Sequence, residues 1–116
     1  MEAKAGDGFY LTLIAEAIAD LERRLGEIDL QRFVSDRDEL ALTAFRLSII
    51  GENANRLSPE LKNRHPTLPW SAMYSFRNVV SHEYHRLSPD RAWDAVESLP
   101  AIAEMVATEL DRLNDN

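Results

Sequence analysis

The stretch FRNVVSHEY, residues 76–84, brings together four side chains that can handle a phosphate group and a proton. Arg77 offers a planar fork of donors that matches a phosphate, and His82 can exchange a proton near neutral pH. Asn78 and Tyr84 can orient either group through hydrogen bonds. The four residues together could support metal-free cleavage of an RNA phosphodiester. In that reaction His82 helps the ribose 2′-hydroxyl attack phosphorus, and Arg77 stabilises the charged transition state.

The spacing of these residues does not place them all on one helical face. At about 100° per residue, Asn78 and His82 lie one turn apart on the same face, which His85 continues if the helix persists. Arg77 and Tyr84 share an adjacent stripe. Arg77 and His82 are about 140° apart on an ideal helix. They therefore converge only through the reach of arginine, a change of backbone between them, or a second subunit.

The same residue types also have ordinary structural roles. An arginine near a helix end commonly caps carbonyl groups or forms a surface ion pair, and a lone histidine is commonly solvated. His82 and His85, with Glu83 between them, suggest zinc. However, HEYH is one residue short of the metalloprotease helix motif, so we expect no metal and no other cofactor.

Three further side chains allow more than one interpretation. Trp70 and Trp93 are expected in the core or at an interface rather than against a cofactor. Glu52 is expected to be a solvated or helix-pairing carboxylate, with a catalytic role left open.

The charge of the chain is unevenly distributed. The formal net charge is −7, which disfavours broad neutralisation of nucleic-acid phosphates. Residues 62–92 contain five basic and two acidic residues, a net charge of +3, so the rest carries −10. All three histidines fall in this basic window, which allows a local anion site. A chance cluster of solvated charges is the alternative.

Length and composition predict one folded domain over residues 1–116. The absence of cysteine excludes disulfides and thiolate metal sites. No apolar run approaches the roughly 18 residues of a membrane helix, and the N-terminal MEAKAGDGF lacks the pattern of a signal peptide. We therefore expect a cytoplasmic protein.

Apolar residues recur at helical spacing along most of the chain. They predict long helices over residues 9–25, ended by Gly26, and over residues 38–57, with a short turn capped by Asp29 between them. Gly51, in mid-helix, indicates a close approach of another helix. A third long helix is expected from Pro69.

Two serine-proline pairs mark further helix starts. Ser58-Pro59 should open a short turn, and Ser88-Pro89 a fourth long helix that Pro100 kinks or restarts. No stretch alternates with period two. The sequence thus predicts an all-α fold, an antiparallel bundle of four or five helices.

Arg77, His82 and Tyr84 form the pattern R-x4-H-x-Y, which resembles the signature of HepT-like toxins in the HEPN superfamily. The likeness covers the chain from Tyr10 onward, although Ser75 stands where glycine is common and the first nine residues lie outside it. Three more blocks resemble the family in the expected order: residues 46–61 (RLSIIGENANRLSPEL), 65–70 (HPTLPW) and 91–102 (RAWDAVESLPAI).

The resemblance implies a small all-α homodimer that acts as an endoribonuclease toxin, with two copies of the motif helix meeting across an active-site cleft. It implies that Arg77 and His82 are catalytic and that Asn78 supports them. It also implies that a minimal nucleotidyltransferase (MntA-like) antitoxin modifies Tyr84 with AMP. The added charge and bulk would inhibit the site.

Two other functions compete with an RNA-cleaving toxin. One is a non-catalytic helical binding module that serves as the partner subunit of a nucleotidyltransferase, which the acidic composition favours. The other is a plain structural dimer.

Overall fold

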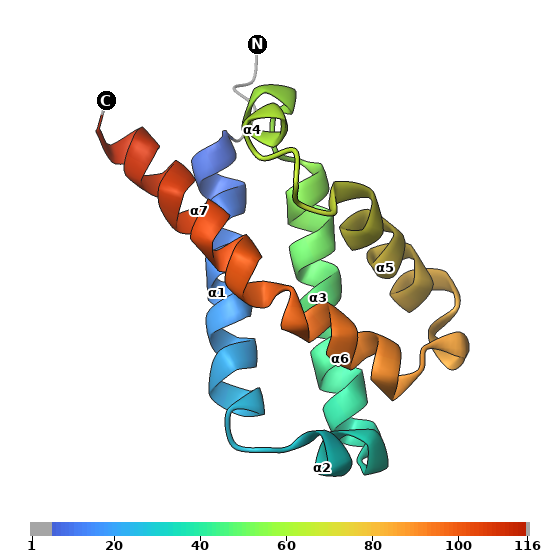
Figure 1. The fold of residues 1–116 in the computed structure, drawn as a ribbon. Coiled ribbons are helices and arrows are strands. Elements are labelled where there is room, and N and C mark those ends of the chain that lie inside the picture. The colour runs from blue at the N-terminus through green and yellow to red at the C-terminus, as the bar shows by residue number, and fades with distance from the viewer. Residues whose placement is uncertain (1–5, 116) are drawn as a thin grey trace.

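The structure, a computed structural model, describes residues 6–115. Residues 1–5, part of the N-terminal segment in which no signal peptide is expected, lie outside this range. The described chain is helical with no strand, which confirms the predicted all-α fold (Figure 1). Its helices are α1 (Asp7–Leu25), α2 (Leu30–Ser35), α3 (Arg37–Asn55), α4 (Pro59–Arg64), α5 (Trp70–His82), the 3-10 turn η1 (Tyr84–Arg86), α6 (Pro89–Glu97) and α7 (Leu99–Asn114).

The described residues therefore form seven α-helices rather than the four or five expected. The extra helices are short, and capping residues identified in the sequence begin them. The side-chain oxygens of Asp29, Ser58 and Ser88 each accept a hydrogen bond from the backbone N–H three residues on, at 2.8, 3.2 and 3.1 Å. Pro100 lies in the first turn of α7, so it marks a restart after α6.

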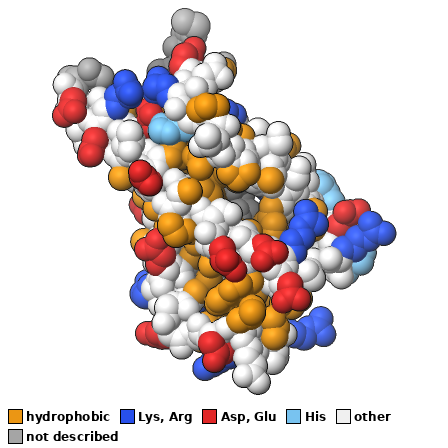
Figure 2. All heavy atoms as spheres, in the orientation of Figure 1, with side chains coloured by type: hydrophobic (Ala, Val, Ile, Leu, Met, Phe, Trp, Pro, Cys, Tyr) orange, Lys and Arg blue, Asp and Glu red, His pale blue; other side chains and the backbone are white. Residues whose placement is uncertain are grey.

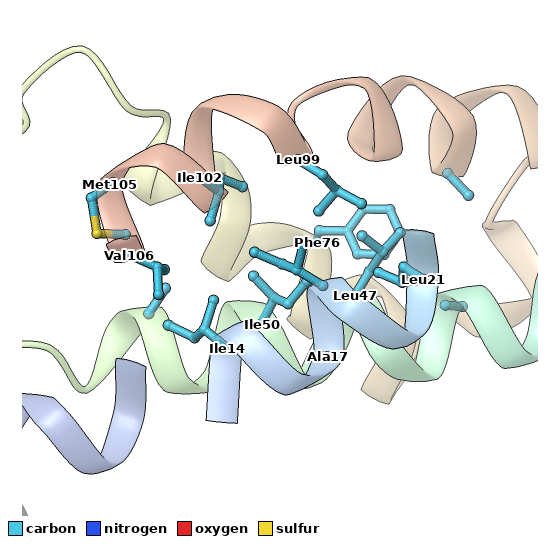
Figure 3. Packing of buried hydrophobic residues seen from close by; sticks show 14 of the residues in the cluster. Ile14, Ala17, Leu21, Leu47, Ile50, Phe76, Leu99, Ile102, Met105 and Val106 are labelled. Atoms are coloured by element: carbon cyan, nitrogen blue, oxygen red, sulfur yellow. The ribbon is translucent and has the colours of Figure 1, made fainter. Parts of the chain in front are cut away.

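Helix α3 is the centre of the fold. It packs against α1, α5 and α6, and α7 in turn crosses α1. Helices α1 and α3 run in opposite directions, joined at one end by α2, and α5 lies on the other side of α3 (Figure 1). Figure 3 shows the apolar side chains of these helices meeting in one cluster, which includes Ile14, Ala17, Leu21, Leu47, Ile50, Phe76, Leu99, Ile102, Met105 and Val106.

The contact between α3 and α5 is close because position 51 is glycine. A Cβ atom added to Gly51 would collide with the backbone carbonyl oxygen of Met73 and would lie 3.1 Å from the Cβ of Arg77. The predicted close approach is therefore confirmed, and its partner is the helix that carries Arg77.

A buried carboxylate, that of Glu109, connects α7 to the segment around α4. Glu109 of α7 is only 1% exposed and binds Arg64 through both its oxygens, at 2.6 and 3.1 Å. It also lies 2.6 Å from Nε2 of His65. The indole N–H of Trp70 donates to the carbonyl oxygen of His65 at 2.9 Å. This Glu109 cluster thus ties α7 to α4 and to the first residue of α5.

Trp93 packs against the fully buried Phe33, with ring centroids 5.0 Å apart. Both tryptophans therefore make structural contacts within the chain. Among the described residues, no helix has the length and apolar character needed to cross a membrane.

Candidate active site

Arg77 is held across the contact between α3 and α5. Its Nε lies 2.8 Å from Oε2 of Glu52, and its Nη1 donates to Oδ1 of Asn78 at 3.1 Å. The side chains of Arg77 and Glu52 are each about one-third exposed, 31% and 33%. Neither interaction uses Nη2, so the guanidinium is oriented while one nitrogen stays available to a phosphate.

Glu52 shares its charge between two arginines. Its Oε1 accepts from Nη2 of Arg56 at 3.0 Å, while its Oε2 faces Arg77. The hydrogen bond from Arg56 and the charge of Arg77 lower the pKa of the Glu52 carboxyl from its ordinary value. Glu52 is therefore ionised at neutral pH, which makes it the helix-pairing carboxylate that the sequence allowed.

Arg77 lines a shallow pocket of about 260 Å³ between α3 and α5. The lining is mostly polar: Ser48, Glu52 and Asn53 come from α3, and Ser81 comes from α5. This pocket gives a phosphate room to approach the guanidinium from solvent.

His82 and Tyr84 lie at the end of α5 and just beyond it. His82 is the last residue of α5, and Tyr84 begins the turn η1; both are exposed, Tyr84 by 40%. Because α5 is helical through His82, the separation of about 140° between Arg77 and His82 holds in the structure. Among residues 6–115, no hydrogen bond or ion pair joins either side chain to Arg77. Within one chain, the structure therefore does not bring Arg77 together with His82 or Tyr84.

The end of α5 also changes two expected stripes. Since the helix stops at His82, His85 falls in η1 and does not continue the face of Asn78 and His82. Tyr84 likewise leaves the stripe of Arg77. Around this turn, Arg86 pairs loosely with Glu83 at 3.4 Å. Figure 2 shows basic, acidic and histidine side chains gathered at this edge of the molecule.

The described part of the chain holds no group of three or more His, Cys, Asp or Glu side chains arranged to bind a metal ion. On α5, the side chains available for chemistry include a hydrogen-bonded arginine, Arg77, and an exposed histidine, His82.

A profile of the family described as Ribonuclease HepT-like matches residues 14–109, which include the whole α3 and α5 pair. This chain belongs to the HepT-like family. Its relatives include "Probable ribonuclease HepT" of Thermococcus cleftensis, 32% identical over 94 residues, or 80% of this chain and 86% of the relative. A protein of Methanocaldococcus jannaschii named "Putative RNase" is 26% identical over 98 residues, 84% of this chain and 90% of that one. No solved structure matches the chain.

For this HepT-like protein, sequence reasoning left the partner of Glu52 undetermined. The position of Glu52, directly after Gly51, was the signal that could have identified this partner. Gly51 predicted a close helix, and a carboxylate beside such a contact can pair with a basic side chain of the neighbouring helix. The Glu109 cluster had no comparable signal, because its partners lie 44 and 45 positions away.

Proposed function

We propose that this HepT-like protein is a metal-independent endoribonuclease and the toxin of a toxin-antitoxin system. The observation that supports this proposal best is the state of Arg77. Its guanidinium is fixed by Glu52 and Asn78 beside an open polar pocket, with Nη2 unused, five residues before the exposed His82. The names of its relatives agree, since they are called ribonucleases.

In the proposed reaction His82 accepts the proton of a ribose 2′-hydroxyl. The 2′-oxygen forms a bond to the adjacent phosphorus, and the bond from phosphorus to the 5′-oxygen breaks. The leaving oxygen takes up a proton, so the products are a 2′,3′-cyclic phosphate and a 5′-hydroxyl. Arg77 stabilises the charge that grows on the phosphoryl oxygens.

A homodimer would complete the site. Arg77 and His82 of one chain point in different directions around the axis of α5. A second copy of α5 that faces the first can bring the arginine and histidine of both chains to one cleft. The active cleft is accordingly proposed to lie between two subunits.

The deciding experiment uses purified protein confirmed by mass spectrometry to be unmodified at Tyr84. Wild type should fragment total RNA in the presence of EDTA, and His82→Ala should not. His85→Ala is the matched control, because this neighbouring histidine lies in η1, off the face of His82. Intact RNA with wild type, while a control nuclease cuts it, would refute the proposed activity.

We further propose that a minimal nucleotidyltransferase antitoxin inhibits the toxin by adenylylating Tyr84. The exposed position of Tyr84, two residues after His82, makes its hydroxyl accessible to a partner enzyme. The phenolic oxygen would bond to the α-phosphorus of ATP, releasing pyrophosphate and the phenol proton. The AMP group would then place negative charge next to the RNA site.

Co-expression with the partner should add the mass of one AMP to wild type and none to Tyr84→Phe. The growth arrest caused by wild type should be relieved in the same cells. Modification of Tyr74 or Tyr10 instead would contradict the assignment of Tyr84.

The second candidate is a non-catalytic partner subunit of a nucleotidyltransferase. The formal charge of −7 and the pI of about 4.9 favour it, because an acidic surface gives RNA little general attraction. The two candidates differ in their salt dependence. A local phosphate grip gives a shallow but measurable slope of RNA affinity against salt, whereas a pure scaffold gives no affinity to measure.

The role of Glu52 yields a separate prediction. Glu52→Gln removes the charge that orients Arg77 but keeps the shape of the side chain, so RNA cleavage should fall by about tenfold. The effect should appear mainly in kcat, because the phosphate can still reach the guanidinium. Glu97→Gln, an exposed change on α6, is the control. Activity equal to wild type would mean that Asn78 alone positions the arginine.

A further inference from the structure

A second polar pocket, of about 330 Å³, opens beside the first turns of α5. Helix α5 contributes Trp70, Ser71, Tyr74 and Ser75, and the facing wall includes Asn55 and Lys62. No acidic side chain lines it, although acidic residues outnumber basic ones by 20 to 13 in the whole chain. The pocket therefore suits a ligand that carries negative charge.

The groups in this pocket have unused binding capacity. Lys62 gives one ammonium hydrogen to the carbonyl oxygen of Asn55 at 3.0 Å, which leaves two for a ligand. The Tyr74 side chain is 37% exposed and has no hydrogen-bond or ring partner among residues 6–115. Trp70 already uses its indole N–H on the His65 carbonyl, so it offers only its ring.

The pocket lies on the same face of α5 as the proposed catalytic histidine. At about 100° per residue, Ser71, Ser75, Asn78 and His82 fall within an arc of about 60°. Tyr74 borders this arc on the side of Arg77. Ser71 and Asn78 are about 10 Å apart along the helix axis, roughly three nucleotides at the stacked spacing of about 3.4 Å. A strand whose cleaved phosphate lies beside His82 can thus continue along the same face of α5 into the pocket.

We propose that this pocket binds a nucleotide of single-stranded RNA that flanks the cleaved phosphodiester. Lys62 contacts its phosphate, the Tyr74 ring stacks on its base, and Ser71 and Ser75 accept or donate hydrogen bonds to its sugar or base. This inference rests on the proposed ribonuclease function, and it adds a binding subsite to it.

Chemistry separates a nucleotide from other occupants of the pocket. A free phosphate would need only Lys62 and leave the exposed aromatic ring without a role. Any of the four bases can stack on an aromatic side chain, provided that the base is unpaired. The subsite therefore selects single-stranded RNA over a duplex, without strong preference for one base.

The test measures binding of a short fluorescein-labelled single-stranded RNA by fluorescence anisotropy, with His82→Ala present in every protein to prevent cleavage. Adding Tyr74→Leu should weaken binding by about tenfold, while Tyr74→Phe, which keeps the ring, should bind like the parent protein. Adding Lys62→Met should reduce the slope of log affinity against log salt by about 0.7, the share of one phosphate contact. Arg32→Met on α2 is the control for a lost surface charge.

The outcomes separate this proposal from the proposed function. Wild-type protein that cuts no RNA refutes the function, and the binding series still decides whether RNA occupies the pocket. Equal affinity of the parent, Tyr74→Leu and Lys62→Met proteins overturns the subsite even if cleavage is observed. Analytical ultracentrifugation of each variant tests whether this face instead forms a contact between two copies of the chain. If Tyr74→Leu dissociates a dimer and leaves the affinity of each chain unchanged, this face joins two copies and the proposal is wrong.

Discussion

RNA cleavage by the Arg77→Lys variant is expected to fall about 100- to 1,000-fold below wild type, the usual cost of removing one transition-state donor. Lysine keeps the positive charge of Arg77 but not its planar set of donors. Arginine uses Nε on Glu52 and Nη1 on Asn78 and still has Nη2 for the phosphate. An ammonium group cannot hold all three partners in fixed directions.

Single-turnover cleavage of a labelled RNA measures this effect, with Arg91→Lys as the matched control on α6, where the arginine is exposed. The proposed toxin activity gives a second measurement in cells: induced wild type should arrest growth, and induced Arg77→Lys should not. If Arg77→Lys keeps more than a tenth of wild-type activity, charge alone is sufficient, and the hydrogen bonds from Arg77 to Glu52 and Asn78 are not part of catalysis.

The largest effect on stability is expected at Glu109. Glu109→Gln leaves Arg64 and His65 facing a neutral amide in a site that is almost fully buried, so the free energy of unfolding should fall by about 3 kcal/mol. Urea denaturation followed by circular dichroism measures this difference. Glu104→Gln, an exposed change on the same helix, should have little effect. A loss below 1 kcal/mol would show that the cluster is not a main source of stability.

The same carboxylate should make stability depend on acid. The hydrogen bonds and charges of Arg64 and His65 lower the pKa of Glu109 from 4.5 to about 2. Because the pKa is lower in the folded state, the unfolded chain binds the proton first as pH falls. The stabilisation is complete above pH 4.5 and is lost as pH falls towards 2, and this part of the pH dependence should be missing in Glu109→Gln.

Local signals in the sequence predicted much of the fold. Gly26 follows the last residue of α1, and the capping groups of Asp29, Ser58 and Ser88 begin α2, α4 and α6 as expected. Each of these features depends on residues within one turn of the helix end, so a short window contains the information. The close approach at Gly51 could also be anticipated, although not which helix would fill it.

What the sequence did not reveal depends on residues far apart in the chain. Glu109 resembles any other acidic residue of a surface helix until the chain folds α4 against it. The end of α5 at His82 likewise lacks a glycine or proline within the helix. After α5, the chain must place Leu87 in the core and begin α6 at Pro89. We attribute the end of α5 at His82 to these two later requirements. The pairing of Glu52 with Arg77 requires knowing that α5 is the helix beside Gly51.

The residue at position 51 controls the distance between Glu52 and Arg77, although its own side chain would take no part in the proposed reaction. Gly51 packs against the backbone of Met73 and the Cβ of Arg77, and the absence of its side chain sets how near the helix of Arg77 lies to the helix of Glu52. Added volume at this position would push the two helices apart and stretch the ion pair between Arg77 and Glu52, although both side chains would still be present. Alanine, serine and valine at position 51 form a series of increasing side-chain volume. We therefore expect the rate of RNA cleavage to fall step by step along this series as the distance between α3 and α5 grows.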